Sequence, residues 1–251
     1  MIETLYETIA IPDSCRLGAR VYKKLFHEKA KLGVTDKKAF RDDIDAILWQ
    51  YSLKPGTIAI QAYEDDHREY FEINVLQIDL KSLNRTRRIA EVIHRAIPYP
   101  LVLIFAYEET CSLSLAHKRF SQATKEAVVA DDIMMTGWIS LKEPAPTESA
   151  FLKSLHLSGL PHTHFYALYT ALTDRLTALA CSGRTGVYSV ITDPEQMEER
   201  RSNLSKCHEL EMEINSLRAA LKNETQFNRR VELMMKLREL EQQLRTLTSL
   251  L

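Results

Sequence analysis

The C-terminal segment 195–251 has the most regular pattern of apolar and polar positions in the chain. It contains no glycine or proline, and its leucines recur at alternating intervals of four and three residues. This spacing places apolar side chains along one face of a helix, as in the seam of a coiled coil. A free helix would leave these side chains in water, so we predict that the segment packs against another helix and that the protein self-associates through it. The first seam is Leu210, Ile214, Leu217 and Leu221, and the second is Leu233, Leu237, Leu240, Leu244, Leu247 and Leu251.

The two seams do not share one heptad register. Counting by sevens from Leu217 reaches Val231, whereas counting back from Leu240 reaches Leu233, so the seams are two residues out of phase. One explanation is a helical hairpin that turns near Asn223, where Gln226 would complete a capping box. The other is a single rod, about 85 Å long, with a local stutter. The rod is the favoured explanation because no glycine or proline marks a turn.

The pattern in residues 1–145 is different and predicts a globular domain of helices and strands. Short alternating or β-branched runs indicate strands, and apolar positions three and four residues apart indicate helices. The run Leu101–Phe105 is apolar throughout and predicts a central strand, whereas only one face of the strand 71–80 is expected to be buried. We predict an α+β fold with a mixed, largely antiparallel sheet and flanking helices, followed by the long coiled-coil helix or helical hairpin. The expected helices are 35–48 and 85–96, and the expected strands are 57–60, 71–80, 101–105, 112–116, 126–129 and 133–139.

Prolines and small polar residues separate the two patterned regions. Pro144, Pro146 and Pro161 lie in a stretch where we expect few long-range contacts. A helix is predicted at about 164–180, and Asp193 followed by Pro194 is a suitable start for the last helical segment. The predicted organisation is therefore an α/β globular domain at 1–145, a linker and helix at 146–194, and a coiled-coil segment at 195–251.

Composition limits the cellular location and the general charge. Lys and Arg number 33 against 34 Asp and Glu, so no overall basic field draws the chain to nucleic acid. The four cysteines are scattered without a CxxC pair, which fits a reducing compartment. The first residues lack the features of a signal peptide, and the longest apolar run is too short to cross a bilayer. We expect a soluble cytoplasmic protein with no membrane partner.

One short motif suggests chemistry. Asp79-Leu80-Lys81 ends a predicted strand and precedes a helix and a second apolar strand. In metal-dependent nucleases an acid in this position binds a divalent cation, and a lysine two residues on orients the attacking water. Glu72, Glu64 or Asp65 would supply the second acid, and Mg²⁺ would then be the cofactor; no other cofactor is expected. The simpler alternative is that Asp79 and Lys81 form the polar end of an exposed strand.

Other polar clusters are less specific. The chain contains two clusters of basic residues. They could contact phosphate groups, or they could be ordinary solvent-exposed faces. No metal site is expected among His156, His162 and His164, which we interpret as surface or capping histidines. The GxxxxGK[ST], GxGxxG, GxSxG and HExxH motifs do not occur, so nucleotide hydrolysis, dinucleotide redox and zincin chemistry have no support. The basic clusters are Lys23, Lys24, Lys29 and Lys31, and Arg85, Arg87 and Arg88 with Lys81.

Four stretches together resemble a bacterial family of unknown function, the family numbered 4391. They are residues 42–55, 71–81, the AIPYP run at 96–100 and the ETQFNRRVEL run at 224–233. The resemblance brings no catalytic residues, because the family has no established activity. It implies a context, since its members are often encoded beside helicases and DNA methyltransferases of restriction-modification type. We therefore expect a non-catalytic accessory subunit of such a defence system, with a metal-dependent or degenerate nuclease-like domain as the alternative.

Overall fold

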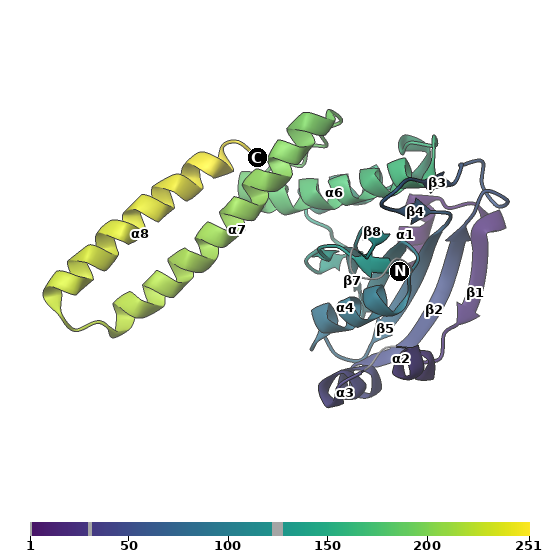
Figure 1. Cartoon of the computed structure of the whole chain (residues 1–251), viewed down its shortest axis with the longest axis horizontal. Coiled ribbons are helices and arrows are strands. Elements are labelled where there is room, and N and C mark those ends of the chain that lie inside the picture. The colour runs from purple at the N-terminus through teal and green to yellow at the C-terminus, as the bar shows by residue number, and fades with distance from the viewer. Residues whose placement is uncertain (1, 30–31, 122–127) are drawn as a thin grey trace. The chain divides into compact units, whose positions relative to one another are not determined.

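The computed structural model describes residues 2–29, 32–121 and 128–251 of the chain (Figure 1). The chain divides into two compact units, Met1–Leu176 and Thr177–Leu251. We call them the globular unit and the hairpin unit. In the described part of the chain, no helix combines the length and the apolar character needed to cross a membrane.

The globular unit is built on one mixed sheet with the strand order β1-β2-β5-β6-β7-β10. Neighbouring strands are antiparallel, except that β5 and β6 run parallel and are connected by helix α4 (Thr86–Ala96). Two separate two-stranded ribbons are β3 with β4, and β8 with β9. The strands are β1 Arg16–Arg20, β2 Ile44–Leu53, β3 Tyr63–Glu64, β4 Glu69–Tyr70, β5 Ile73–Leu80, β6 Leu101–Tyr107, β7 Thr110–Leu115, β8 Lys118–Phe120, β9 Val128–Ala130, β10 Met134–Met135 and β11 Ile139–Ser140, which also pairs with β7.

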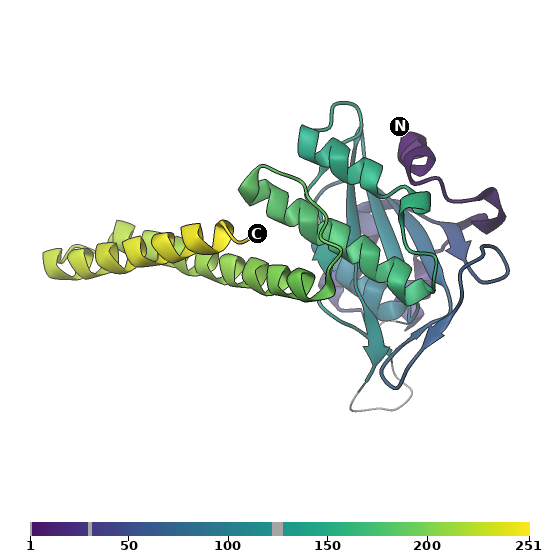
Figure 2. The same ribbon diagram turned by 90° about the horizontal axis from the view of Figure 1, so that it is seen from above.

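Helices cover both faces of this sheet (Figure 2). On one face, α2 (Lys24–Lys29), α3 (Val34–Asp42) and α4 enclose a core that includes Leu76, Ile78 and Phe105. The other face packs beneath α1 (Ile2–Ile9), α5 (Pro146–Ser154) and the start of α6 (Phe165–Thr185), with short 3₁₀ turns at Asp13–Cys15 and Leu157–Gly159. Burial of apolar surface on both faces explains why β5 and β6 are almost continuously buried.

The predicted helix 35–48 is wrong in its second half, because residues from Ile44 onward form strand β2. Ile44 and Ile47 are both fully buried in the same core, which is the spacing expected for a helix. The structure explains this spacing by a β-bulge between Ile44 and Ala46, which brings residues three apart to one face of a strand. The β-bulge therefore gave the apolar residues of this strand the spacing that is typical of a helix.

Three further expectations need correction. Residues 57–60 form a turn and bend rather than a strand. The proline-marked stretch contains α5, and its Phe151 and Leu155 are buried instead of lying in a linker with few contacts. Both faces of β5 are buried, not one. The predicted helix 85–96 and the strands at 101–105 and 112–116 are confirmed, while 126–127 lies outside the described residues.

The hairpin unit contains two long antiparallel helices, α7 (Pro194–Asn223) and α8 (Phe227–Thr248). The single rod is therefore wrong, and the hairpin is correct. The turn forms without glycine because the Glu224 carboxylate accepts hydrogen bonds from the backbone N–H groups of Thr225 and Gln226, each at 2.8 Å. Asp193 caps α7 as predicted, accepting from the N–H of Gln196 at 2.9 Å.

The two leucine seams belong to the arms of this hairpin. Ile214 on α7 and Leu240 on α8 are their most buried members, at 3% and 7% exposure. Ion pairs connect the arms at 2.7 Å between Lys236 and Glu213 and at 2.8 Å between Arg218 and Glu241. The other seam residues are only half-buried, so the pairing of α7 with α8 covers the seams in part.

Candidate functional site at the end of strand β5

The Asp79-Leu80-Lys81 motif lies where β5 ends, beside the start of β2. The Nζ of Lys81 is 3.5 Å from a carboxylate oxygen of Asp45, which occupies the bulge of β2, and the backbone of Asp79 pairs with that of Ala46. Both side chains of the ion pair are more than half exposed. Residues two apart in a strand project from one face, so Asp79 and Lys81 share a face of the sheet. We call Asp45, Asp79 and Lys81 the carboxylate corner.

A hydrogen bond from Gln77 on the same strand holds the carboxylate of Asp79, and side chains of β2 and α1 in turn hold Gln77. The side-chain amide of Gln77 donates to Asp79 Oδ1 at 2.6 Å. The Gln77 carbonyl in turn accepts from the Tyr6 hydroxyl at 3.0 Å and from the Gln50 amide at 2.9 Å. Burial, together with the nearby Tyr51 and Asp79, raises the pKa of Tyr6, so its hydroxyl remains a donor. A cleft of about 520 Å³ opens beside this network.

Glu72 does not join the carboxylate corner. It precedes β5, seven residues from Asp79, which corresponds to about 23 Å along a strand. There it forms an ion pair with Lys54 at 3.0 Å and accepts from the amide of Asn74 at 2.9 Å. An ion bound by Asp79 is therefore out of reach of Glu72.

The acids of the β3–β4 ribbon have other partners as well. Asp65 accepts hydrogen bonds from the Tyr63 hydroxyl at 2.8 Å and from the backbone N–H groups of His67 and Arg68 at 2.7 and 2.9 Å, so it closes the turn. Glu64 lies in strand β3, beside this turn. In the described ranges, no group of three or more His, Cys, Asp or Glu side chains is arranged to hold a metal ion.

Two of the arginines predicted to contact phosphate form ion pairs that join structural elements. Arg85 contacts Asp43 with its Nε and Nη2 atoms, at 2.6 and 2.9 Å. Arg88 contacts Asp36 in the same two-pronged way, at 2.7 and 3.0 Å, and this interaction lowers the pKa of Asp36. Arg87 remains largely exposed, 4.0 Å from Glu91.

The lysine cluster approaches the carboxylate corner. Lys23 donates from Nζ to the carbonyl of Ile44 at 2.6 Å. Burial and the nearby charges of Lys81 and Arg20 lower the pKa of Lys23, while Asp45 acts in the opposite direction. Lys24 lies exposed at the start of α2. The side chain of Lys29 and all of Lys31 lie outside the described residues.

The histidines near Pro161 behave as caps. His156 accepts through Nδ1 from the N–H of Ser158 at 3.3 Å, and His164 accepts through Nδ1 from the N–H of Ala167 at 3.0 Å. The ring of His164 also stacks on Tyr63, with 4.6 Å between centroids. The capping interpretation is confirmed for these two residues.

Sequence reasoning missed the contributions of Asp45, Gln77 and Tyr6. Asp45 stood in a predicted helix, so its position beside Lys81 depended on recognising the bulge. Tyr6 lies 71 residues from Gln77 in sequence, and no spacing rule connects them. The alternating pattern of β5 places Gln77 and Asp79 on one face of the strand. This pattern was the one feature of the sequence that could have identified Gln77 as a neighbour of Asp79.

Comparison with known proteins identifies the family. The family model for domain of unknown function 4391 matches residues 9–244. The chain belongs to this family. The match includes the whole carboxylate corner and ends within α8, whereas Tyr6 precedes it. No curated protein and no solved structure is significantly similar to the chain.

Proposed function

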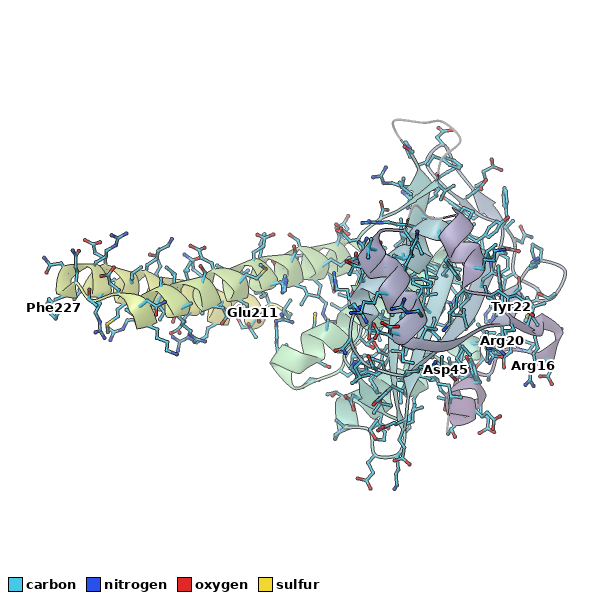
Figure 3. All side chains as sticks on the ribbon, turned by 90° about the horizontal axis from the view of Figure 1, so that it is seen from below. Arg16, Arg20, Tyr22, Asp45, Glu211 and Phe227 are labelled. Carbon is cyan, nitrogen blue, oxygen red and sulfur yellow. The ribbon has the colours of Figure 1, made fainter. Side chains whose placement is uncertain are left out.

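We propose that the protein is a non-catalytic accessory subunit that assembles through its helical hairpin. The observation that carries this proposal is a second apolar face on α8. Phe227, Val231, Met234 and Met235 are 76%, 39%, 42% and 67% exposed, and their spacing of four, three and one places them along one side of the helix. Figure 3 shows Phe227 projecting from the end of the hairpin. We call these four residues the α8 row.

The α8 row is separate from the leucine seams, whose members are buried or half-buried. Exposed apolar side chains that line one face of a helix are typical of an interaction surface, and methionine adapts to different partners. The partner is a second copy of the chain or a helicase or DNA methyltransferase subunit. Members of the family are often encoded beside helicases and DNA methyltransferases. This genomic context favours a role in a bacterial restriction-modification or phage-defence system, located in the cytoplasm.

The double substitution Val231→Glu/Met235→Glu is expected to weaken self-association at least about tenfold, because it places two charges in the centre of the row. Sedimentation velocity over a concentration series would measure the shift toward monomer. Val187→Glu is the matched control, since Val187 is 64% exposed in the same unit and lies outside α8. An unchanged mass in the double variant, or a monomeric wild type that copurifies with no partner, would contradict the proposal.

A second candidate function is a nuclease-like domain, and the carboxylate corner favours it. Asp79 and Lys81 lie on one face at the end of β5, with Asp45 next to Lys81 on the adjacent strand. Under this proposal Asp45 and Asp79 would hold a divalent cation, whose chemistry is to polarise a phosphodiester and to acidify water. Gln77 orients the Asp79 carboxylate, and the ammonium group of Lys81 is available to position the attacking water.

Lys81→Ala is expected to reduce Mg²⁺-dependent cleavage of DNA at least about 100-fold, since it removes the group that positions water. Lys54→Ala is the matched control, because Lys54 has the same side-chain exposure of 53% and an ion pair at the opposite end of β5. The measurement is the single-turnover rate on a labelled duplex. Cleavage that survives Lys81→Ala, or that is lost equally in Lys54→Ala, would remove the carboxylate corner as its site.

A further inference from the structure

A groove lined mainly by apolar side chains lies at the β1 edge of the main sheet. It has a volume of about 620 Å³ and is formed by β1, the two residues that follow it, the start of α2 and one residue of β2. Figure 3 shows Arg20 and Tyr22 on this flank of the globular unit. We call this hollow the β1 groove. Its apolar lining consists of Leu17, Ala19, Val21, Tyr22, Leu25 and Trp49.

The floor of the β1 groove is held in place by the core beneath it. Val21 belongs to the buried core on the α2, α3 and α4 side of the sheet, and Leu25 and Trp49 pack against that core. The indole N–H of Trp49 donates to the side-chain oxygen of Asn74 at 3.1 Å, which fixes the orientation of the ring. A floor that is already ordered reduces the entropy cost of binding.

The rim of the β1 groove is exposed to solvent. Leu17 and Tyr22 are 55% and 74% exposed, so both side chains are available to contact an occupant. Trp49, Tyr22 and Arg20 supply the three residue types that most often dominate binding energy at protein interfaces. A lining that is mostly aliphatic and aromatic matches the apolar side chains of a polypeptide better than the sugars and phosphates of a nucleic acid.

The charged side chains of the β1 groove are cationic. Arg20 and Lys24 line it, and no Asp or Glu does so among the residues that the structure describes. Arg20 is exposed and forms no ion pair within that part of the chain. Asp45, near the start of β2, is not part of the lining, and its carboxylate is 3.5 Å from the ammonium group of Lys81. An occupant that carries carboxylates beside its apolar side chains therefore complements the groove.

Charge and backbone geometry both disfavour a second copy of the chain as the occupant. A two-fold contact between copies repeats the same surface on both sides, so the cations of one groove would face those of the other. Gly18 has a positive φ of 60° and lies in a β-bulge between Arg16 and Ala19. The bulge interrupts the row of N–H and C=O groups that strand pairing between copies requires. Recognition at this edge therefore depends on side chains.

We infer that the β1 groove docks a segment of a partner protein in which apolar or aromatic side chains are flanked by Asp or Glu. The apolar side chains pack on Leu25 and Trp49 between the exposed rings and methyl groups of the rim. The carboxylates contact Arg20 and Lys24 in charge-assisted hydrogen bonds. The inference is independent of the α8 row and of the carboxylate corner, because the groove lies in the globular unit and binding there needs no metal ion.

The probe for this inference is a library of random peptides displayed on phage. Peptides that bind the Leu17→Ala/Tyr22→Ala protein are removed first, and the rest are selected against the immobilised full chain. The enriched peptides are expected to combine Leu, Phe, Tyr or Trp with Asp or Glu. Anisotropy of a fluorescein-labelled synthetic copy then measures the dissociation constant for each protein. Leu17→Ala/Tyr22→Ala is expected to weaken binding at least about tenfold, and Arg20→Ala about three- to tenfold with a smaller dependence on salt.

Two matched controls remove similar side chains elsewhere in the globular unit. Phe71→Ala/Tyr99→Ala deletes two apolar side chains that are 46% and 43% exposed, and Arg87→Ala deletes an exposed arginine of α4. Both controls are expected to retain the affinity of the wild type. The inference is overturned by a selection that enriches no peptide, by enriched peptides that lack Asp and Glu, or by an equal loss in the controls.

Sedimentation velocity of Leu17→Ala/Tyr22→Ala tests the alternative occupant. The variant is expected to have the same mass as the wild type, because the groove is not a contact between copies. A shift toward monomer would assign the groove to a second copy and would overturn the inference as well. Both substituted side chains are more than half exposed, and circular dichroism verifies that the variant folds.

Discussion

Lowering the pH from about 7 to about 4 is expected to destabilise the globular unit by about 3 kcal/mol through His94 alone. His94 lies on α4 with no exposed surface, and its Nε2 is 3.1 Å from the hydroxyl of Ser114. Its Nδ1 has no hydrogen-bond partner among the residues that the structure describes. Burial, and then the charge of Lys118, lower the pKa of His94 to about 3. Lys118 is nearby because its ammonium donates to the carbonyls of His94 and Ile97 at the end of α4.

The direction of this pH effect follows from the protonation of His94 in the unfolded and folded states. An unfolded His94 takes up a proton near pH 6.5, whereas the folded one stays neutral until about pH 3. Stability from this group is therefore complete above pH 6.5 and is lost progressively as the pH falls toward 3. Urea unfolding followed by tryptophan fluorescence measures it, since Trp49 and Trp138, the two tryptophans of the chain, both lie in the globular unit.

His94→Gln isolates this contribution from that of the carboxylates. The substitution keeps a hydrogen-bonding side chain near Ser114 but removes the titration. The variant should therefore lose about 3 kcal/mol less than the wild type over the same pH range, whatever its stability at pH 7. Parallel pH profiles for the two proteins would contradict the assignment.

Tyr169→Phe is expected to lower the free energy of unfolding of the globular unit by about 2–4 kcal/mol, because it leaves buried backbone groups without a partner. The hydroxyl of Tyr169 on α6 lies in the interior between β6 and the end of β7. It donates toward the carbonyls of Leu101 and Ala116 at 2.7 and 3.0 Å and accepts from the N–H of Ala116 at 3.0 Å. One oxygen atom thus connects a helix to two strands.

The same substitution at Tyr99 provides the control for Tyr169→Phe. Tyr99 is 43% exposed, so the loss of its hydroxyl should change stability by less than about 0.5 kcal/mol. Tyr70→Phe is an intermediate case, because the hydroxyl of Tyr70 contacts His117 at 2.7 Å and accepts from the N–H of Lys118 at 3.1 Å. A loss below about 1 kcal/mol in Tyr169→Phe would show that water replaces the hydroxyl.

Sequence patterns predicted the elements whose burial is one-sided or continuous. The amphipathic run 86–96 and the apolar run 101–105 are α4 and the centre of β6, because a helical stripe and a doubly buried strand each leave a distinct periodicity. The start of β2 was misread because a bulge gave Ile44 and Ile47 a helical spacing. The segment is a strand because it pairs with β1 and β5. Pairing between residues far apart in the sequence leaves no local pattern from which it could be predicted.

The candidate site was only half predictable for the same reason. Asp79 and Lys81 are neighbours in sequence, so the strand pattern sufficed to place them together. Asp45 reaches Lys81 from 36 positions away along the chain, and Glu72, although nearer in sequence, lies at the far end of the same strand. Glu72 is close to Asp79 in sequence, which suggested it as a second metal ligand. The length of the extended strand between them excludes it from the site.

The short turn between α7 and α8 has a consequence for the order of folding. Only residues 224–226 separate the two helices, so their pairing requires the closure of a very small loop. The sheet, in contrast, must bring β1 to β2 across 23 intervening residues before either edge is stabilised. Local contacts form faster than distant ones, and the hairpin is therefore expected to acquire its structure first. The α8 row would then be present on partly folded chains, where it can join two copies before their sheets are complete.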